Sequence, residues 1–461
     1  MYSLSDAILQ EDIESVRQML RYGSINQIDE YGFTPLIEAA ITDNIKIADL
    51  LLREHADPNQ TDVTGGTALQ WAVENNNQEL CKLLLSNRAN PNAYNLSGQP
   101  ILALPILRQQ SDLRQLLVQG GADVTFAQDY INTKLLGHMF ELVGTASIVD
   151  PNNQFVEVDM EGFYLEVTLG LIADSVQQFQ NHFAARQLRR YSGLAQFIVQ
   201  VMLRASQLIK YQQYRVDIRK YLPTIDAIIN QEPLIIPVGY EGHAITFIKY
   251  GDIWVKCDRR EDSRLYDNVM FYRIGNLQNA NADLVKSLIY VKQSSEFINE
   301  ELDRLLGLTP MTEIKVAAQI SGNCSWANVE ATIPAIFFLV LSSLNHDQNA
   351  HSYYKTLALQ FFTRWREWNK ERALHFCIDS YEKGDSIRKA CKAEILAAIL
   401  FQSCNIHEIN DRARIDLIMN VLLKSPYEYL IKNYLRVYHY EGRTEEGKRF
   451  AELVREYDFK V

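Results

Sequence analysis

Hydrophobic and polar positions divide the chain into three parts with different periods. Up to about residue 125, apolar residues recur at helical spacing within short segments that repeat along the sequence. Between residues 126 and 345, strand-like alternation is found in residues 155–167, 233–240, 243–250 and 252–258, with helical spacing between them. From residue 346 to 461 only helical spacing is found. We therefore predict a multidomain chain with an α-helical solenoid, an α+β domain and a helical C-terminal region.

The N-terminal part repeats with a period near 33 residues. Residues 56–59, 89–92 and 122–125 each begin with Ala and a polar residue, and residues 32–40 recur as residues 65–73 and 97–105. The Thr/Pro turn of the first of these segments starts one helix, and leucine pairs such as Leu51-Leu52 bury the next. No such unit can bury its own apolar face, so at least three must stack.

This period, with its Thr34-Pro35-Leu36 triplet, resembles the ankyrin repeat. The resemblance implies about four repeats over residues 1–125, the first and fourth acting as caps, and a surface that binds another protein. Hairpin tips are expected at Asp29, Tyr31, Asp62, Thr64, Tyr94 and Asn95. Acidic and aromatic side chains there suit a partner protein with a basic rim. The alternative is that these residues only cap turns.

In the α+β part, residues 243–258 are predicted to form a hairpin. If Tyr250-Gly251 is the two-residue turn, His243 faces Asp258 with their Cβ atoms about 5 Å apart. Asp258 can then accept the imidazole N–H and fix its tautomer, as the acid of a catalytic triad does. If Gly251-Asp252 is the turn, His243 faces Arg260 instead.

Cys324 lies in the segment Gly-Asn-Cys-Ser-Trp, and Asn323 before it is a favourable helix N-cap. A cysteine in the first helical turn is favoured as a thiolate by free N–H groups and the helix dipole. Five residues upstream, the amide of Gln319 could stabilise an oxyanion together with the Cys324 N–H. Because Pro334 must interrupt or restart the helix, the cysteine helix should be short and the apolar run after it should be core.

The order His243, Asp258, Gln319, Cys324 resembles the cysteine proteases of the adenain and Ulp kind and their acetyltransferase relatives, while Cys-Ser-Trp is similar to the papain active-site helix. The resemblance implies Cys324 as nucleophile, His243 as base, Asp258 as orienting acid and Gln319 as oxyanion donor, acting on a peptide or isopeptide bond. One alternative is a non-catalytic scaffold in which Cys324 is a core residue. An acyltransferase on the same site is the other.

Composition narrows the possible partners. The chain has 461 residues, a net charge of -11 and a pI near 5.4, which argues against a surface built to coat nucleic acid or anionic membrane. Six cysteines without paired spacing fit reduced thiols in a chain with no metal site, and no cofactor is expected. The uncharged stretch of residues 331–346 is shorter than the ~20 residues of a membrane span, so membrane insertion is not expected. The N-terminus carries no signal-peptide pattern.

The C-terminal segment, residues 440–461, is rich in glutamate. Beside the repeats and the protease-like middle part, it resembles the Glu-rich C-terminal signals of bacterial type IV effectors. The whole chain is similar to the ankyrin-repeat effectors that Legionella delivers through its Dot/Icm system. That resemblance implies a secreted virulence protein that binds a host protein in the host cytosol, with the nucleus as a second compartment.

Overall fold

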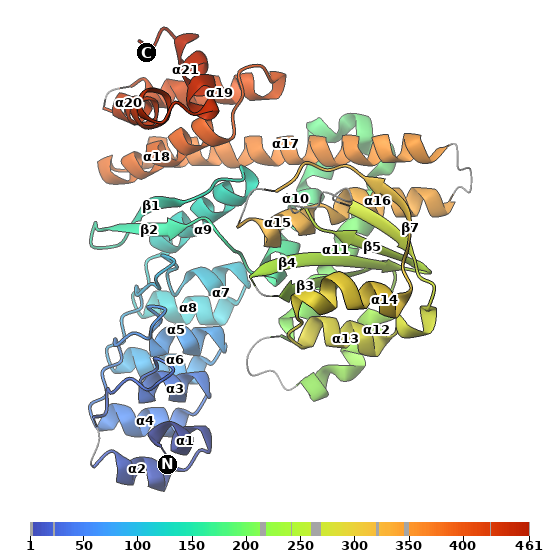
Figure 1. Cartoon of the computed structure of the whole chain (residues 1–461). Helices are drawn as coiled ribbons and strands as arrows, with labels where there is room; N and C mark the ends of the chain where they lie inside the picture. Colours follow the sequence, from blue (N-terminus) through green and yellow to red (C-terminus); the bar gives the residue numbers. More distant parts are fainter. Residues whose placement is uncertain are drawn as a thin grey trace.

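The computed structural model describes residues 3–21, 24–212, 218–240, 242–259, 269–319, 322–344, 350–424 and 426–460 (Figure 1). Stacked helix pairs form the N-terminal end, a five-stranded sheet between helices forms the middle, and helices form the C-terminal end. The predicted fold class is therefore confirmed: a repeat array, an α+β part and a helical C-terminal region. The division at residues 125 and 345 stays a prediction.

The array contains four helix pairs, as predicted: α1 (Leu4–Leu9) with α2 (Ile13–Met19), α3 (Pro35–Ile41) with α4 (Ile45–Arg53), α5 (Ala68–Glu74) with α6 (Gln78–Ser86), and α7 (Ala103–Leu107) with α8 (Ser111–Gln119). Thr34 and Thr67 cap the first helices of the second and third pairs by accepting the N–H three residues on. One apolar cluster runs through all four pairs, from Ala7 to Ala127. The array is a single stacked core, as repeat physics requires.

Asp29, Asp62 and Asn95 occupy equivalent positions in three successive hairpin tips and hold their own turns together. The carboxylate of Asp62 accepts hydrogen bonds from the backbone of Thr64 and Gly66, the Thr64 hydroxyl and the Trp71 indole. Asp62 is only 6% exposed. Asp29 and Asn95 likewise accept N–H bonds two and four residues on. Three of the six residues predicted to contact a partner therefore stabilise their own turns.

Replacing Asp62 with alanine is therefore expected to destabilise the array by about 2 kcal/mol, because two backbone N–H groups and an indole N–H lose their acceptor. Urea unfolding followed by far-UV circular dichroism measures the change. Asp112→Ala, an exposed position in α8, is the control and should shift stability by less than about 0.5 kcal/mol. Equal effects of the two substitutions would show that the Asp62 network contributes nothing.

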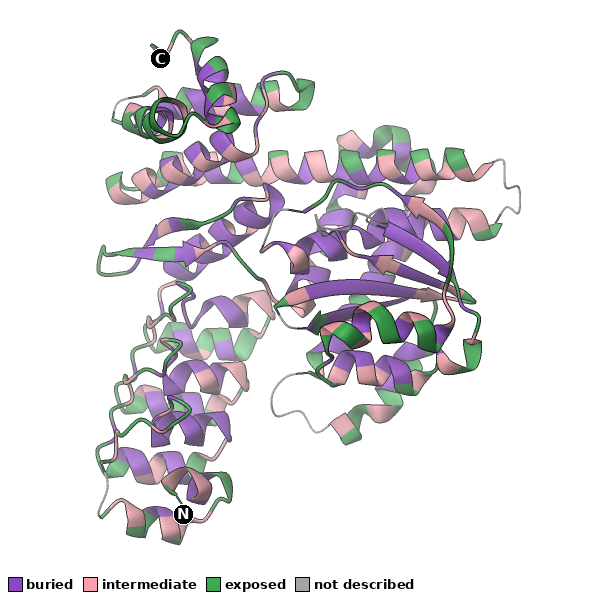
Figure 2. Ribbon diagram, viewed as in Figure 1, coloured by how far each residue is buried: buried purple, intermediate pink, exposed green. Residues whose placement is uncertain are grey.

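The middle part is built on an antiparallel sheet whose strands follow sequence order: β3 (Leu234–Tyr240), β4 (His243–Tyr250), β5 (Ile253–Cys257), β6 (Val269–Arg273) and β7 (Thr309–Ile314). One face packs on α10 (Leu165–Asn181), η1 (Phe183–Tyr191), α11 (Ser192–Lys210), α15 (Cys324–Glu330), α16 (Thr332–Leu344) and α17 (His351–Lys383). The other packs on η2 (Ile218–Tyr221), α12 (Leu222–Ile229), α13 (Ala282–Tyr290), η4 (Phe297–Glu301) and α14 (Leu302–Leu306). The short η3 (Leu277–Asn279) lies between β6 and α13 in the sequence. Figure 2 shows the strands largely buried between these layers.

Two elements join the array to the sheet. Helix α9 (Val124–Met139) begins against the last repeat, and its C-terminal half enters the main core. The hairpin of β1 (Thr145–Val149) and β2 (Phe155–Asp159) follows it. The strand predicted over residues 155–167 thus ends at Asp159, because α10 begins at Leu165. The array and the sheet meet through regular structure.

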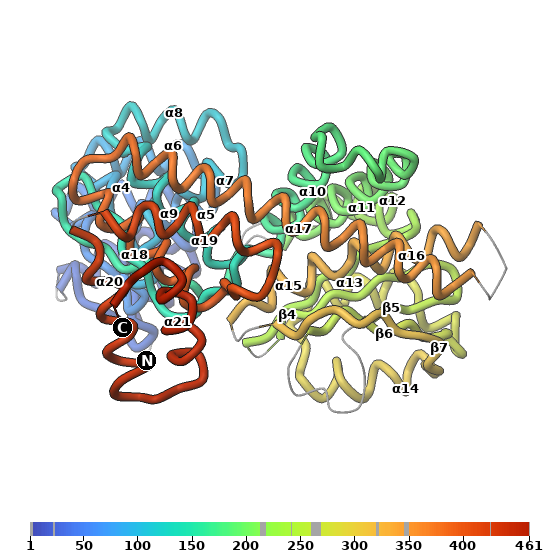
Figure 3. Tube along the Cα trace, turned by 90° about the horizontal axis from the view of Figure 1, so that it is seen from above, coloured from blue at the N-terminus to red at the C-terminus, as the bar shows by residue number. Residues whose placement is uncertain are grey.

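The C-terminal helices share the main core. Helix α17 has 33 residues and crosses from the sheet side to the array side (Figure 3). It is followed by α18 (Ser386–Gln402), α19 (Ile409–Leu422), α20 (Glu428–Tyr434), η6 (Leu435–Glu441) and α21 (Glu445–Arg455). Lys392 of α18 pairs with the buried Asp129 of α9 at 2.8 Å. One apolar cluster includes residues from Leu136 to Val454.

The apolar run after Cys324 is a broken helix. Helix α15 ends at Glu330 and α16 starts at Thr332, so Pro334 lies in the first turn of α16, where a missing N–H costs little. This agrees with the predicted short cysteine helix. In the described ranges, only the run Cys324–Leu344 is long and apolar enough to cross a membrane by length and composition, and 72% of it is buried inside the protein. That burial is typical of a core helix.

Candidate active site

Cys324 is the first residue of α15 and lies against the start of β4. The backbone N–H of Ala244 donates to its Sγ at 3.3 Å. The local turn depends on Gly322, whose φ is +83° and where a Cβ would lie 2.6 Å from Cγ of Glu161. Cys324 is partly exposed, whereas the other five cysteines are buried. Of the six thiols, this one is open to a substrate.

His243 and Asp258 lie beside Cys324. The Nε2–H of His243 donates to Oδ1 of Asp258 at 3.1 Å, and both side chains are about one-sixth exposed or less. Because Nε2 is engaged by the carboxylate, Nδ1 is the ring nitrogen that remains for the thiol. The Tyr240 ring packs edge-on against the imidazole at 5.6 Å. Three of the four predicted catalytic side chains are thus brought together.

The strand register behind this contact differs from the preferred prediction. Tyr250 pairs with Ile253 and Thr246 with Cys257, so the turn is Gly251-Asp252. In this register Asp258 is the diagonal neighbour of His243, and a diagonal neighbour on the same face is within reach of long side chains. The prediction of a directly opposed pair was wrong, although the contact forms. Arg260, expected opposite His243 in this register, lies outside the described residues.

The pKa values of the two reactive groups move in opposite directions. Burial raises the pKa of the Cys324 thiol, but the hydrogen bond and charge of His243 and the N–H groups of Ala244 and Ser325 outweigh it, and the pKa falls below its usual range. Burial lowers the pKa of His243, but Asp258 and Cys324 together raise it to about 9. Burial raises the pKa of each other cysteine, to about 12 for Cys404. A thiolate–imidazolium pair is favoured at neutral pH.

Gln319 lies in the segment between β7 and α15. Its backbone N–H donates to the carbonyl of Arg259, the residue after Asp258, at 2.8 Å. The side chain is buried, and its Oε1 has no partner among the described residues. No hydrogen bond joins it to Cys324 in the described part of the chain. The role of Gln319 as oxyanion donor stays a prediction.

Asn323 lies at the N-cap position before α15 but does not cap the helix with its side chain, contrary to expectation. Its Oδ1 instead accepts from Nδ1–H of His138 at 2.7 Å, and its Nδ2 donates to the His138 carbonyl. Burial lowers the pKa of His138 to about 4, so the imidazole is neutral. The ring stacks parallel to Trp326 at 5.8 Å. The end of α9 therefore holds the residue before Cys324.

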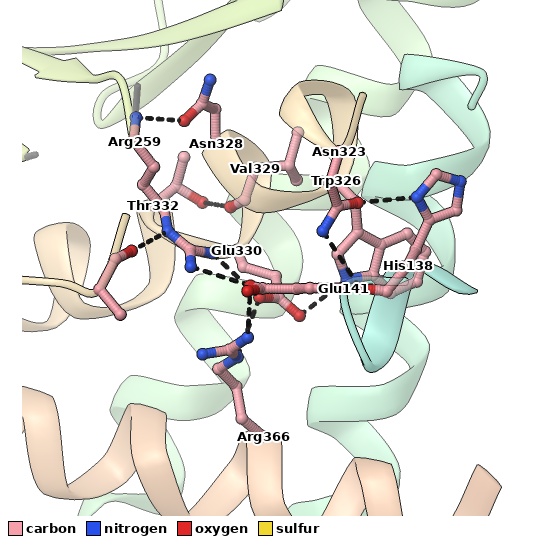
Figure 4. Close-up of polar contacts among 11 residues, drawn as sticks. His138, Glu141, Arg259, Asn323, Trp326, Asn328, Val329, Glu330, Thr332 and Arg366 are labelled. Atoms are coloured by element: carbon pink, nitrogen blue, oxygen red, sulfur yellow. Dashed lines mark hydrogen bonds and ion pairs between the residues drawn. The ribbon is translucent and has the colours of Figure 1, made fainter. Parts of the chain in front are cut away.

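Four charged side chains lie behind the site, two of them buried (Arg259 and Glu330) and two partly buried (Glu141 and Arg366) (Figure 4). The fully buried Arg259 donates to Glu141 at 2.9 Å and to the Ala317 carbonyl at 2.7 Å, and lies 3.7 Å from Glu330. Arg366 of α17 pairs with the same two carboxylates at 2.8 and 3.1 Å. The cluster ties α9, α15 and α17 to the backbone that carries Asp258.

Sequence reasoning missed Asn328, Arg259 and His138. Asn328 is four residues after Cys324 on the same face of α15, and this spacing was a usable signal. Arg259 bonds to Glu141, 118 residues away in the sequence, and His138 bonds to Asn323, 185 residues away. No local sequence pattern reveals such contacts. In the parts of the chain that the structure covers, no group of three or more His, Cys, Asp or Glu side chains could hold a metal ion.

Comparison with known proteins identifies the repeats. Residues 54–128 match the family of ankyrin repeats in three copies, and residues 31–63 match the single ankyrin repeat. The curated proteins contain no match to this sequence. Among solved structures, the chain is similar to the Legionella effector AnkH, with a TM-score of 0.82 and 37% sequence identity, over 98% of this chain and 97% of that one.

The fold and these matches define an ankyrin-repeat protein with an additional α+β part. At this identity over nearly the whole of both chains, the protein belongs to the AnkH family of Legionella effectors. The predicted relationship is confirmed.

Proposed function

We propose that this protein is a translocated effector that binds a host protein through its ankyrin array and cleaves a peptide or isopeptide bond with Cys324. The observation that carries the proposal is the contact of one partly exposed, low-pKa thiol with a histidine oriented by Asp258. Its AnkH relative is a Legionella effector, which supports action inside a host cell. The cytosol, with the nucleus as a second compartment, is the proposed location.

The proposed reaction follows from the protonation states of the pair. The Cys324 thiolate attacks the carbonyl carbon and forms a tetrahedral intermediate, whose oxyanion the Gln319 amide and a backbone N–H would stabilise. The His243 imidazolium then gives its proton to the leaving amine, and a thioester remains. Neutral His243 next takes a proton from water as the water attacks the thioester, and the intermediate collapses to the carboxylic acid and the Cys324 thiolate. The thiolate–imidazolium pair is thereby restored. Attack by an amine instead of water would make the site an acyltransferase.

Exposed apolar side chains at the hairpin tips support the array as the partner-binding surface. Tyr31 is 66% exposed, Val63 65% and Leu96 78%, beside Tyr94 and Thr64 at the same tips. Large apolar side chains that are this exposed in neighbouring tips suit contact with another protein. Asp29, Asp62 and Asn95 would position these tips.

The test compares wild type with Cys324→Ala in host-cell lysate. Mass spectrometry of newly formed N-termini and freed lysine side chains is expected to detect products with wild type and none with the variant. His375→Ala, at an exposed histidine of α17, should behave as wild type. If wild type and Cys324→Ala give the same products, the catalytic proposal fails and the scaffold alternative remains.

Partner binding is tested separately. Capture of a host partner should survive Cys324→Ala, but should fall at least about tenfold in the double variant Tyr31→Ser with Leu96→Ser.

A further inference from the structure

Asn328 connects β4, which carries His243, to the segment after β5 that carries Asp258. Its Oδ1 accepts the backbone N–H of Arg259 at 2.7 Å, and its Nδ2 donates to the carbonyl of Ala244 at 2.6 Å. The side chain is 1% exposed, so both bonds form without competition from water. One amide therefore fixes the residue after His243 and the residue after Asp258.

The place of this amide in the sheet explains why it matters. The ladder between β4 and β5 ends at the pair Thr246–Cys257, and beyond it no strand pairing holds Ala244 next to Arg259. Asn328 bridges these two backbones where the ladder has stopped. Ala244 also donates its own N–H to Sγ of Cys324 at 3.3 Å. The same amide thus influences the thiol, the imidazole and the carboxylate.

We propose that Asn328 is a positioning residue of the active site: its side-chain amide sets His243 against Asp258 and aims the Ala244 N–H at Cys324. This inference rests on the proposed function, because it concerns the same three side chains. The position requires a donor and an acceptor on one short side chain. Asparagine supplies both, whereas leucine, which is branched at the same carbon, supplies neither, and the hydroxyl of serine is too short to span the two backbones.

The experiment measures the rate of Cys324 alkylation by iodoacetamide against pH, with mass spectrometry to follow that residue, in wild type and Asn328→Leu. The expected result is an alkylation midpoint at higher pH and a rate at pH 7 lower by roughly tenfold, because one pKa unit is a factor of ten in thiolate. Asn328→Ser is measured in parallel and decides the question if the leucine variant does not fold.

Thr332→Val is the matched control. Thr332 is equally buried, one turn further on, and its hydroxyl donates to the carbonyl of Val329 across the break between α15 and α16, so this bond holds neither Ala244 nor Arg259. This variant should lose thermal stability and keep the wild-type alkylation midpoint. Folded Asn328 variants with the wild-type midpoint would overturn the positioning role. An ordinary thiol midpoint in wild type itself would overturn the proposed function, and so the two failures are distinguishable.

Discussion

Replacing His243 with alanine is expected to slow the alkylation of Cys324 at pH 7 by at least about tenfold. In the wild type, burial alone would raise the pKa of this thiol, and contact with His243 is the largest influence that lowers it. Without the imidazole, burial is opposed only by backbone N–H groups. The thiol should then resemble the five buried cysteines, whose pKa values are all raised.

The pH dependence has a defined sign. Wild-type alkylation should disappear as pH falls through the lowered pKa of Cys324, because the thiolate becomes protonated. As pH rises through about 9, His243 loses its proton and the thiolate remains, so alkylation persists. Bond cleavage needs the His243 proton and should therefore decline above about pH 9. A plot of activity against pH should therefore be bell-shaped, whereas the rate of alkylation should rise once with pH and then stay level.

Alkylation of Cys324 followed by mass spectrometry across this pH range checks the prediction. His375→Ala controls for loss of an exposed histidine and should leave the profile unchanged. If His243→Ala alkylates as fast as wild type at pH 7, the two residues are not coupled. Cys324 would then be an ordinary helix residue, and the protein would work by binding.

Replacing Arg259 with methionine is expected to cost about 3–5 kcal/mol of the free energy of unfolding. The guanidinium is fully buried and bonds to Glu141 and the Ala317 carbonyl, with Glu330 at 3.7 Å. Removing it leaves the buried Glu330 and the partly buried Glu141 to share one cation, Arg366. Uncompensated charge in a buried site costs more than the lost bonds themselves.

Urea unfolding of the two proteins measures this cost. Arg364→Met serves as the matched control, because Arg364 is exposed on α17 and should shift stability by less than about 0.5 kcal/mol. A loss below about 1 kcal/mol for Arg259→Met would mean that the charge cluster is not needed for folding. The Arg259 variant should also lose Cys324 reactivity, since the guanidinium anchors the backbone of residue 259, whose N–H and carbonyl bond to Asn328 and Gln319.

Residue type and order were enough to predict that Cys324, His243 and Asp258 lie together, and the repeat period was enough to predict the array. The hairpin register was wrong because Tyr250-Gly251 and Gly251-Asp252 are both acceptable turns, and only packing chooses between them. The contact between His243 and Asp258 still forms because the two registers differ by two positions, and a shift of two leaves each side chain on the same face of the sheet. Phe247 and Trp254, which the Tyr250-Gly251 turn would place directly opposite each other, likewise meet diagonally, with ring centroids 5.3 Å apart.

Other features depend on contacts that the sequence does not encode locally. Asp62 was expected to face a partner, because acidic residues in loops are usually solvated, yet it accepts four hydrogen bonds from its own hairpin. Asn323 has the residue type of a helix cap, but its side chain is used by His138, 185 residues earlier. In both cases a polar residue had several possible partners, and the tertiary fold selected one.

Helix α9 belongs to two cores at once: Phe126 and Ala127 pack with the last repeat, while Leu136 and Met139 pack in the main core, next to His138 and its bonds to Asn323. A recombination event that exchanged the array for another would have to cut before this helix and deliver a last repeat that fits its face. Because α9 is one continuous helix, it also couples the array mechanically to the site. A force that a bound protein exerts on the array would be transmitted through this helix to Asn323, the residue before Cys324.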